Sequence, residues 1–411
     1  MGGLPVLAWV LAAVAAAAMT GPTGPRTDSA THRAGRLTLA EAAGASDQDL
    51  PVEQPEGPVR PSVSGNDSDL PIEIPQPPAS SESRSPADAL AEQAWAMRAR
   101  GDLPGSLAGL DKAVALDPKS YLAHALRGYV LLGLHRTDEA ATEFEMAHSL
   151  VDDGPLALLG MAQIEMNRGH LDEALAGYGR VIAAAPELAE GYAYRGMILM
   201  EQGRLDAAQA DLDHALQLAP KTALTLGYRS RLRFLQGQPD AALIDADAAI
   251  AADPSQAYAA YMVRGAVTAG RGRLADGLAA YQQASRLEPG DPDALAAIGL
   301  VHLAMRNPTA AAEDFDKALA LGPASPAALQ GVAQLELFQH RFEPAVGHFS
   351  KALESQPRNP QLLLARGHAY YLWGKMALAR KDIEAALAAA PGDARVLQAA
   401  QMLKRDISLS R

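Results

Sequence analysis

A repeat period of 34 residues constrains this chain more than any other feature of its sequence. Prolines mark the period, with one interval of 35 residues: Pro186, Pro220, Pro254, Pro289, Pro323, Pro357 and Pro391. A repeat of this length is one supersecondary unit, which stacks on its neighbours to bury a continuous core. The 411 residues, a length typical of two or three globular domains, are therefore expected to form one extended stack.

Nine units can be indexed from residue 87 onward, and four positions within them keep the same kind of residue. Position 8 is small in all nine units, position 15 is Gly in six, position 20 is Ala in seven and position 27 is Ala in eight. The units begin at Ala87, Tyr121, Pro155, Ala189, Ala223, Tyr258, Pro292, Pro326 and Pro360.

The fourth unit shows why the units are expected to be helical hairpins. Apolar or small residues recur at i, i+4, i+7 and i+8, the spacing of one helix face: Tyr192, Gly196, Leu199 and Met200. Gly203 is expected to end this helix and Pro220 to end the second, because Gly adopts positive φ easily and Pro cannot donate to the helical ladder. The small residues let the helices approach closely.

The columns at positions 8, 20, 24, 27 and 32 resemble those of the tetratricopeptide repeat family, and the resemblance covers residues 87–393. It implies an all-α fold, a right-handed superhelical solenoid of about nine helical hairpins. Residues 394–411 are expected to form a capping helix and a short tail. The family implies protein binding in general and no chemistry of its own.

The N-terminal 85 residues differ in composition from the repeats. Residues 4–19 form an uncharged run that ends in Ala16, Ala17, Ala18 and Met19, so residues 1–19 are expected to be a signal peptide or an uncleaved apolar anchor. No Lys or Arg precedes the run, which leaves translation from Met19 as a third reading. Residues 20–85 are rich in Pro, Ser and Asp and are expected to be a disordered linker.

The resemblance also implies that positions 2, 5, 9, 12 and 13 of each first helix line a concave groove. The Met and aromatic content of these columns suits an adaptable site for a peptide segment. The same side chains could instead fill a tightly wound superhelix. The predicted groove residues are Trp95, Tyr129, Gln163, Met166, Met197, Met200, Arg231, Phe234, Leu300, Gln334, Phe338, His368 and Tyr371.

A second column is charged. Position 7 is Arg in five units, and in four of these an acidic residue follows sixteen positions later: Arg127 and Glu143, Arg195 and Asp211, Arg229 and Asp245, Arg366 and Asp382. Both positions lie on facing helices of one hairpin, so we expect ion pairs within each repeat.

No residue pattern indicates catalysis, a cofactor or a metal ion. The chain has no Cys, no H-E-x-x-H and no G-x-S-x-G, and its Gly374-Lys375 pair lacks the rest of a phosphate-binding loop. We expect a protein that is not an enzyme. A formal charge of −12 also argues against nucleic acid as a partner.

The sequence therefore predicts a binding scaffold or adaptor for other proteins or peptide segments, exported to the periplasm or secreted, that assists assembly in the cell envelope. Membrane contact is expected only if the N-terminal segment stays uncleaved. Two alternatives are an accessory module that presents a polymer such as a glycan to a separate enzyme, and a cytoplasmic adaptor that starts at Met19.

Overall fold

The computed structural model describes residues 85–98 and 100–409. In this part of the chain all regular structure is helical, with 19 α-helices, one short 3₁₀ helix and no strand. The predictions for residues 1–19 and for the linker up to residue 84 lie outside the described residues.

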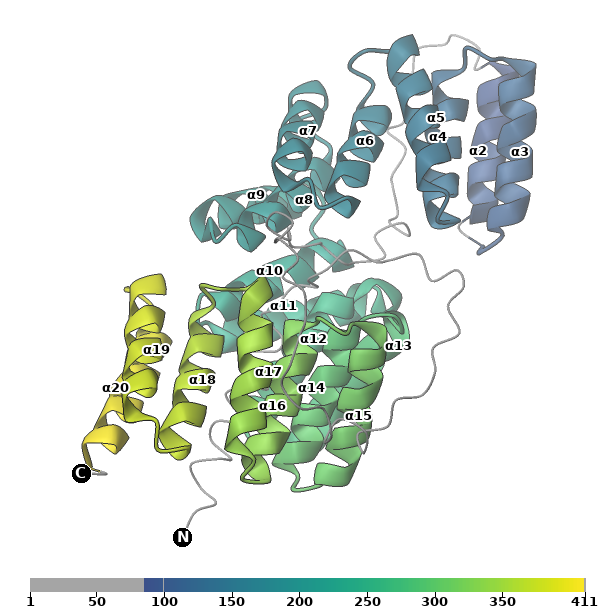
Figure 1. Ribbon diagram of the computed structural model, residues 1–411. Coiled ribbons are helices and arrows are strands. Elements are labelled where there is room, and N and C mark those ends of the chain that lie inside the picture. Colours follow the sequence, from purple (N-terminus) through teal and green to yellow (C-terminus); the bar gives the residue numbers. More distant parts are fainter. Residues whose placement is uncertain (1–84, 99, 410–411) are drawn as a thin grey trace, which may run out of the picture.

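Helices α2 to α19 form nine successive hairpins, which we number 1 to 9 along the chain (Figure 1). Each first helix has 13 residues and each second helix has 14. The first helices are α2 (Pro86–Arg98), α4 (Tyr121–Gly133), α6 (Pro155–Asn167), α8 (Ala189–Glu201), α10 (Ala223–Leu235), α12 (Tyr258–Gly270), α14 (Pro292–Ala304), α16 (Pro326–Phe338) and α18 (Pro360–Leu372). The second helices are α3 (Leu103–Leu116), α5 (Thr137–Leu150), α7 (Leu171–Ala184), α9 (Leu205–Leu218), α11 (Pro239–Ala252), α13 (Leu274–Leu287), α15 (Pro308–Leu321), α17 (Phe342–Ser355) and α19 (Met376–Ala389). The predicted all-α solenoid is confirmed.

The turn inside each hairpin has one geometry throughout. The residue at position 15 has a positive φ in all nine hairpins, between 58° and 80°. Six of these residues are Gly, and the other three are His135, Arg306 and His340. The left-handed turn is thus a property of the hairpin, and three hairpins form it with side chains that adopt positive φ less readily than Gly.

The single extra residue in the repeat lies between hairpins 5 and 6. Here the 3₁₀ helix η2 (Pro254–Gln256) follows α11, and the Asp253 side chain accepts a hydrogen bond of 2.9 Å from the Ser255 backbone N–H. The insertion is thus taken up in the connection, and the next hairpin keeps its register.

Buried aromatic rings at position 24 join neighbouring hairpins. Phe144 is fully buried between Gly128 of its own hairpin and Gly160 of the next, and Phe315 lies in the same way between Gly299 and Gly331. A Cβ built on Gly160 or Gly331 would lie 2.3 or 2.2 Å from the ring, closer than any van der Waals contact allows. These glycines are required for hairpins to stack closely.

The core follows the solenoid as successive clusters of buried apolar side chains and has no single centre. Hairpins 1 to 3 and hairpins 6 to 9 lie in two groups that α8 to α11 connect (Figure 1). The chain curves so far that its C-terminal end reaches its middle. Arg395 Nη2 donates a 2.8 Å hydrogen bond to the backbone oxygen of Leu235 in α10.

Helix α20 (Ala394–Leu409) ends the stack. Its buried residues recur at i, i+4, i+7 and i+11: Val396, Ala400, Leu403 and Ile407. The helix packs on α18 and α19, while Met402 is 57% exposed on its outer face. One apolar stripe and one solvated face are what the predicted capping helix requires.

Candidate functional site

The thirteen predicted groove residues all lie on first helices, from α2 at one end of the solenoid to α18 at the other. They occupy positions 9, 12 and 13, so they form columns that continue from one hairpin to the next. The fold therefore arranges them along one path.

Burial divides this set. Nine of the thirteen are buried: Tyr129, Gln163, Met166, Met197, Met200, Phe234, Leu300, Gln334 and His368. Trp95, Arg231, Phe338 and Tyr371 are partly exposed. In this conformation the four partly exposed side chains are the ones that a partner can contact first.

Aromatic side chains pack together at the N-terminal end of the columns. The ring of Trp95 meets the ring of Tyr129 edge-on at 6.2 Å, and Tyr129 meets Phe144 in the same manner at 4.8 Å. The Tyr129 hydroxyl donates a 2.7 Å hydrogen bond to the Leu156 backbone oxygen. The Arg98 guanidinium lies 4.6 Å from the centre of the Trp95 ring. Tyr129 thus holds two hairpins together, and Trp95 with Arg98 forms the outer edge of this cluster.

Charges gather in the middle of the columns. Arg231 Nη1 lies 2.6 Å from Glu201 Oε1 on the preceding first helix. Asp293, at position 2 of α14, is buried and accepts a 3.2 Å hydrogen bond from the Ser325 hydroxyl. Burial raises the pKa of the Asp293 carboxyl well above its usual value, and the neighbouring Asp291 raises it further. Asp293 is not among the predicted groove residues, and its burial became evident only from the structure.

At the C-terminal end His368 and Tyr371 stack with ring centres 6.3 Å apart. His368 is 4% exposed, and burial lowers its pKa to about 4, so its imidazole is neutral at pH 7. Phe338 and Tyr371 therefore present partly exposed aromatic rings, and the neutral His368 adds no positive charge to this surface.

The predicted ion pairs across the hairpins are confirmed. The Arg at position 7 and the acid at position 23 are 2.6 to 2.8 Å apart in hairpins 2, 4, 5 and 9: Arg127 and Glu143, Arg195 and Asp211, Arg229 and Asp245, Arg366 and Asp382. The hydrogen bond to Asp211 raises the pKa of Arg195, which keeps the guanidinium charged. Arg264, which has no acid sixteen positions later, lies 3.5 Å from Asp247 of the preceding hairpin.

Hairpins 7 and 8 replace this ion pair with a pair between positions 11 and 23. His302 Nδ1 lies 2.6 Å from Asp314 Oδ2, and His348 Nδ1 lies 2.9 Å from Glu336 Oε2. The order of base and acid is reversed between the two hairpins. The Arg column and its sixteen-residue interval do not predict either pair.

Family profiles described as tetratricopeptide repeat match residues 91–155, 264–326 and 333–394, and a second profile of the same description matches residues 189–222. The chain belongs to the tetratricopeptide repeat family. Proteins of this family are generally protein-interaction scaffolds. No curated protein sequence matches the chain significantly.

Solved structures share the tetratricopeptide fold. The crystal structure of the APC/C hetero-tetramer Cut9-Hcn1 superposes with a TM-score of 0.54 at 17% identity, over 77% of this chain and 69% of that one. The structure of a human IFIT1 dimer with m7Gppp-AAAA superposes with a TM-score of 0.50 at 16% identity, over 73% of this chain and 80% of that one. At these identities the likeness concerns the fold.

The described residues of this tetratricopeptide protein hold no group of three or more metal-ligating side chains. Within the same residues, no helix combines the length and the apolar composition needed to cross a membrane. The partly exposed side chains of the columns are three aromatic residues and Arg231, which is paired with Glu201.

Proposed function

We propose that this tetratricopeptide protein is a non-enzymatic scaffold that binds partner proteins or peptide segments along its first-helix columns. The observation that carries the proposal is the partly exposed set in these columns, three aromatic side chains and one Arg, presented by consecutive first helices of the stack. Aromatic side chains and Arg dominate the binding energy of protein interfaces. The buried neighbours, such as Tyr129, fix the backbone that presents them.

We further propose that the protein is exported and takes part in assembly within the cell envelope. The support is the uncharged run of residues 4–19, which ends in small residues suited to a signal peptidase. Residues 20–84, rich in Pro, Ser and Asp, would then lie between the export signal and the solenoid.

Partner capture tests the binding site. Immobilised full-length protein is expected to retain a specific partner from an envelope extract. Replacing both Phe338 and Tyr371 with Ala is expected to weaken retention about tenfold or more, because truncated hot-spot residues each cost about 1–2 kcal/mol or more. The matched control is Leu321→Ala with Met402→Ala, which truncates two exposed apolar side chains outside the columns. If both double variants retained a specific partner equally, its binding site would lie outside the columns. If the protein captured no partner, the binding proposal would be wrong.

Intact-mass analysis of the native protein tests export. The chain recovered from the periplasm is expected to begin near Met19. A full-length chain in the membrane fraction would mean an uncleaved anchor. A chain that begins at Met19 in the cytosol would mean internal initiation and would overturn the export proposal while leaving the binding proposal intact.

A further inference from the structure

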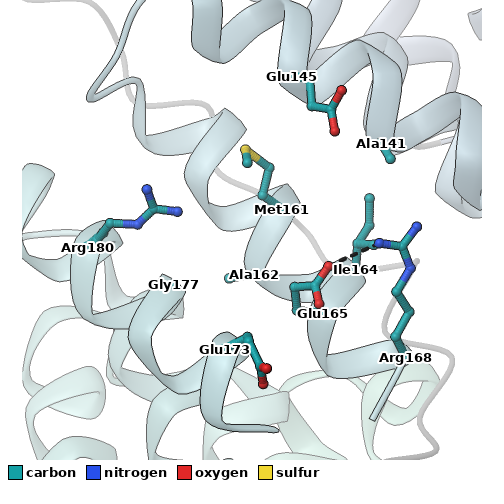
Figure 2. A pocket seen from close by; sticks show the side chains of 10 residues that line it. All are labelled: Ala141, Glu145, Met161, Ala162, Ile164, Glu165, Arg168, Glu173, Gly177 and Arg180. Carbon is teal, nitrogen blue, oxygen red and sulfur yellow. Dashed lines mark hydrogen bonds and ion pairs between the residues drawn. The ribbon is translucent and has the colours of Figure 1, made fainter. Parts of the chain in front are cut away.

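A cavity of about 310 Å³ opens between α5, α6 and α7, and none of the thirteen predicted groove residues lines it (Figure 2). Its floor is apolar and consists of the buried Ala162, Ile164 and Gly177 with the partly exposed Met161. Its volume lies near the lower end of ligand pockets, which run from about 300 to 1,000 Å³. A space of this size suits one long side chain.

The repeat register explains why hairpin 3 has this cavity. Position 7, where the ion-paired hairpins carry Arg, is Met161, and position 23, where they carry the acid, is Gly177. Neither the pair of positions 7 and 23 in hairpins 2, 4, 5 and 9 nor the pair of positions 11 and 23 in hairpins 7 and 8 can form here. A side chain at Gly177 is also disfavoured, because its Cβ would lie 2.8 Å from the Cβ of Ala162. Hairpin 3 therefore lacks the Arg, and no side chain at position 23 fills its place.

One carboxylate that such an Arg would bond is still present. In hairpins 2 and 5 the position 7 Arg also bonds position 25 of the preceding hairpin: Arg127 with Asp111 at 2.8 Å and Arg229 with Asp213 at 2.9 Å. The corresponding residue beside Met161, sixteen positions earlier, is Glu145. It lines the cavity, is exposed, and forms no ion pair with the described residues.

The other rim charges differ in whether they are already neutralised. Glu165 is bonded by Arg168 at 3.0 Å and by His170 at 2.6 Å. Glu173 and Arg180 are both exposed on α7, across the cavity from Glu145 of α5, and neither forms an ion pair with the described residues (Figure 2). Two carboxylates and one guanidinium thus remain for a ligand.

We propose that this cavity binds the arginine side chain of a partner protein. The aliphatic part of that side chain packs on Met161 and Ile164, and its guanidinium bonds Glu145, with Glu173 adding a second negative charge. The partner's arginine would thus make the contact with position 25 that the chain's own Arg127 and Arg229 make in hairpins 2 and 5. Arg180 remains available for an acidic group beside the arginine. The inference rests on the proposed function only in taking the ligand to be a protein segment.

An acidic side chain is a poorer occupant of the same cavity. Its carboxylate would need Arg180 alone, since Arg168 is already paired with Glu165, and it would lie against an apolar floor near Glu145. Burial of a charge without a bonded partner is costly. The peptide series below separates the two occupants.

The binding test uses the full-length protein with ¹³C-labelled Met and Ile methyl groups and three tripeptides. Gly-Arg-Gly is expected to shift the Met161 and Ile164 methyl signals with a millimolar Kd, typical of a single side chain. Gly-citrulline-Gly, which keeps the shape and loses the charge, is expected to bind at least about threefold more weakly. Gly-Glu-Gly is expected to leave both signals in place.

Variants identify the groups that recognise the charge. Glu145→Gln is expected to weaken binding of Gly-Arg-Gly about threefold, whereas Arg180→Gln is expected not to weaken it. Met161→Arg places an arginine in the cavity from within the chain, so the Ile164 signal should no longer respond to the peptide and the melting temperature should not fall. Met305→Arg is the matched control, because it adds the same charge at an exposed Met in hairpin 7.

Three results would overturn the inference. A response to Gly-Glu-Gly in place of Gly-Arg-Gly would make the cavity an anion site. Equal responses to arginine and citrulline would mean that charge is not recognised, and no response at saturating peptide would mean that the cavity binds neither. None of these results depends on the groove columns, so partner capture through Phe338 and Tyr371 can succeed or fail separately.

Discussion

Replacing Phe315 with Ala is expected to lower the free energy of unfolding by about 3–5 kcal/mol, the usual cost of removing a buried Phe ring. The ring is fully buried and joins hairpins 7 and 8. The ring contacts glycines of its own hairpin and of the next one, so hairpins further along the stack cannot compensate for the lost contact. Urea unfolding followed by far-UV circular dichroism measures the effect.

A double-mutant cycle tests whether Gly331 is required because a side chain there would overlap the Phe315 ring. Gly331→Ala alone is expected to cost about 1–3 kcal/mol by overpacking, because the added Cβ would lie 2.2 Å from the Phe315 ring. In the Phe315→Ala background the same change meets a cavity and is expected to be neutral or stabilising. Gly347→Ala is the control: its Cβ meets nothing within 4 Å, so it should stabilise α17 by about 0.5–1 kcal/mol. Additive costs at residues 315 and 331 would contradict this account.

The fold could be predicted because its determinants are local and repeat nine times. Each hairpin carries its own apolar face, its small residues and its stop signals, and the repetition makes even partial matches informative. The turns at His135, Arg306 and His340 show the limit of this reasoning. A column that is Gly in six units predicts positive φ there, but nothing in those three residues indicates that the same turn persists.

The site could be predicted less fully, because burial depends on how tightly consecutive hairpins wind. The columns locate Met166 and Leu300 correctly on the first helices, but the column pattern does not indicate that both are fully buried. Ion pairs with a fixed sequence spacing could be predicted more fully: the sixteen-residue interval between Arg195 and Asp211 predicts their contact. The cavity beside Met161 required the structure, since it arises from side chains that are missing from a column.

Acidification is expected to destabilise the protein through His368. Burial lowers the pKa of this imidazole to about 4 in the folded state, whereas an unfolded His titrates near 6.5. As the pH falls below about 6.5, the unfolded chain binds a proton that the folded chain does not bind, so stability falls with pH until about pH 4. Between pH 7 and pH 5 the loss from this one residue is about 2 kcal/mol.

Comparing wild type with His368→Gln in urea at pH 7 and pH 5 isolates this contribution, because the variant lacks the titrating group and should lose about 2 kcal/mol less. His348 provides a control of opposite sign. The hydrogen bond to Glu336 raises the pKa of its imidazole, so this pair stabilises the fold below about pH 6.5 and loses that effect as the pH rises through the folded pKa. His348→Gln should therefore be more harmful at pH 5 than at alkaline pH. If both variants had the pH dependence of the wild type, neither the lowered pKa of His368 nor the raised pKa of His348 would contribute to stability.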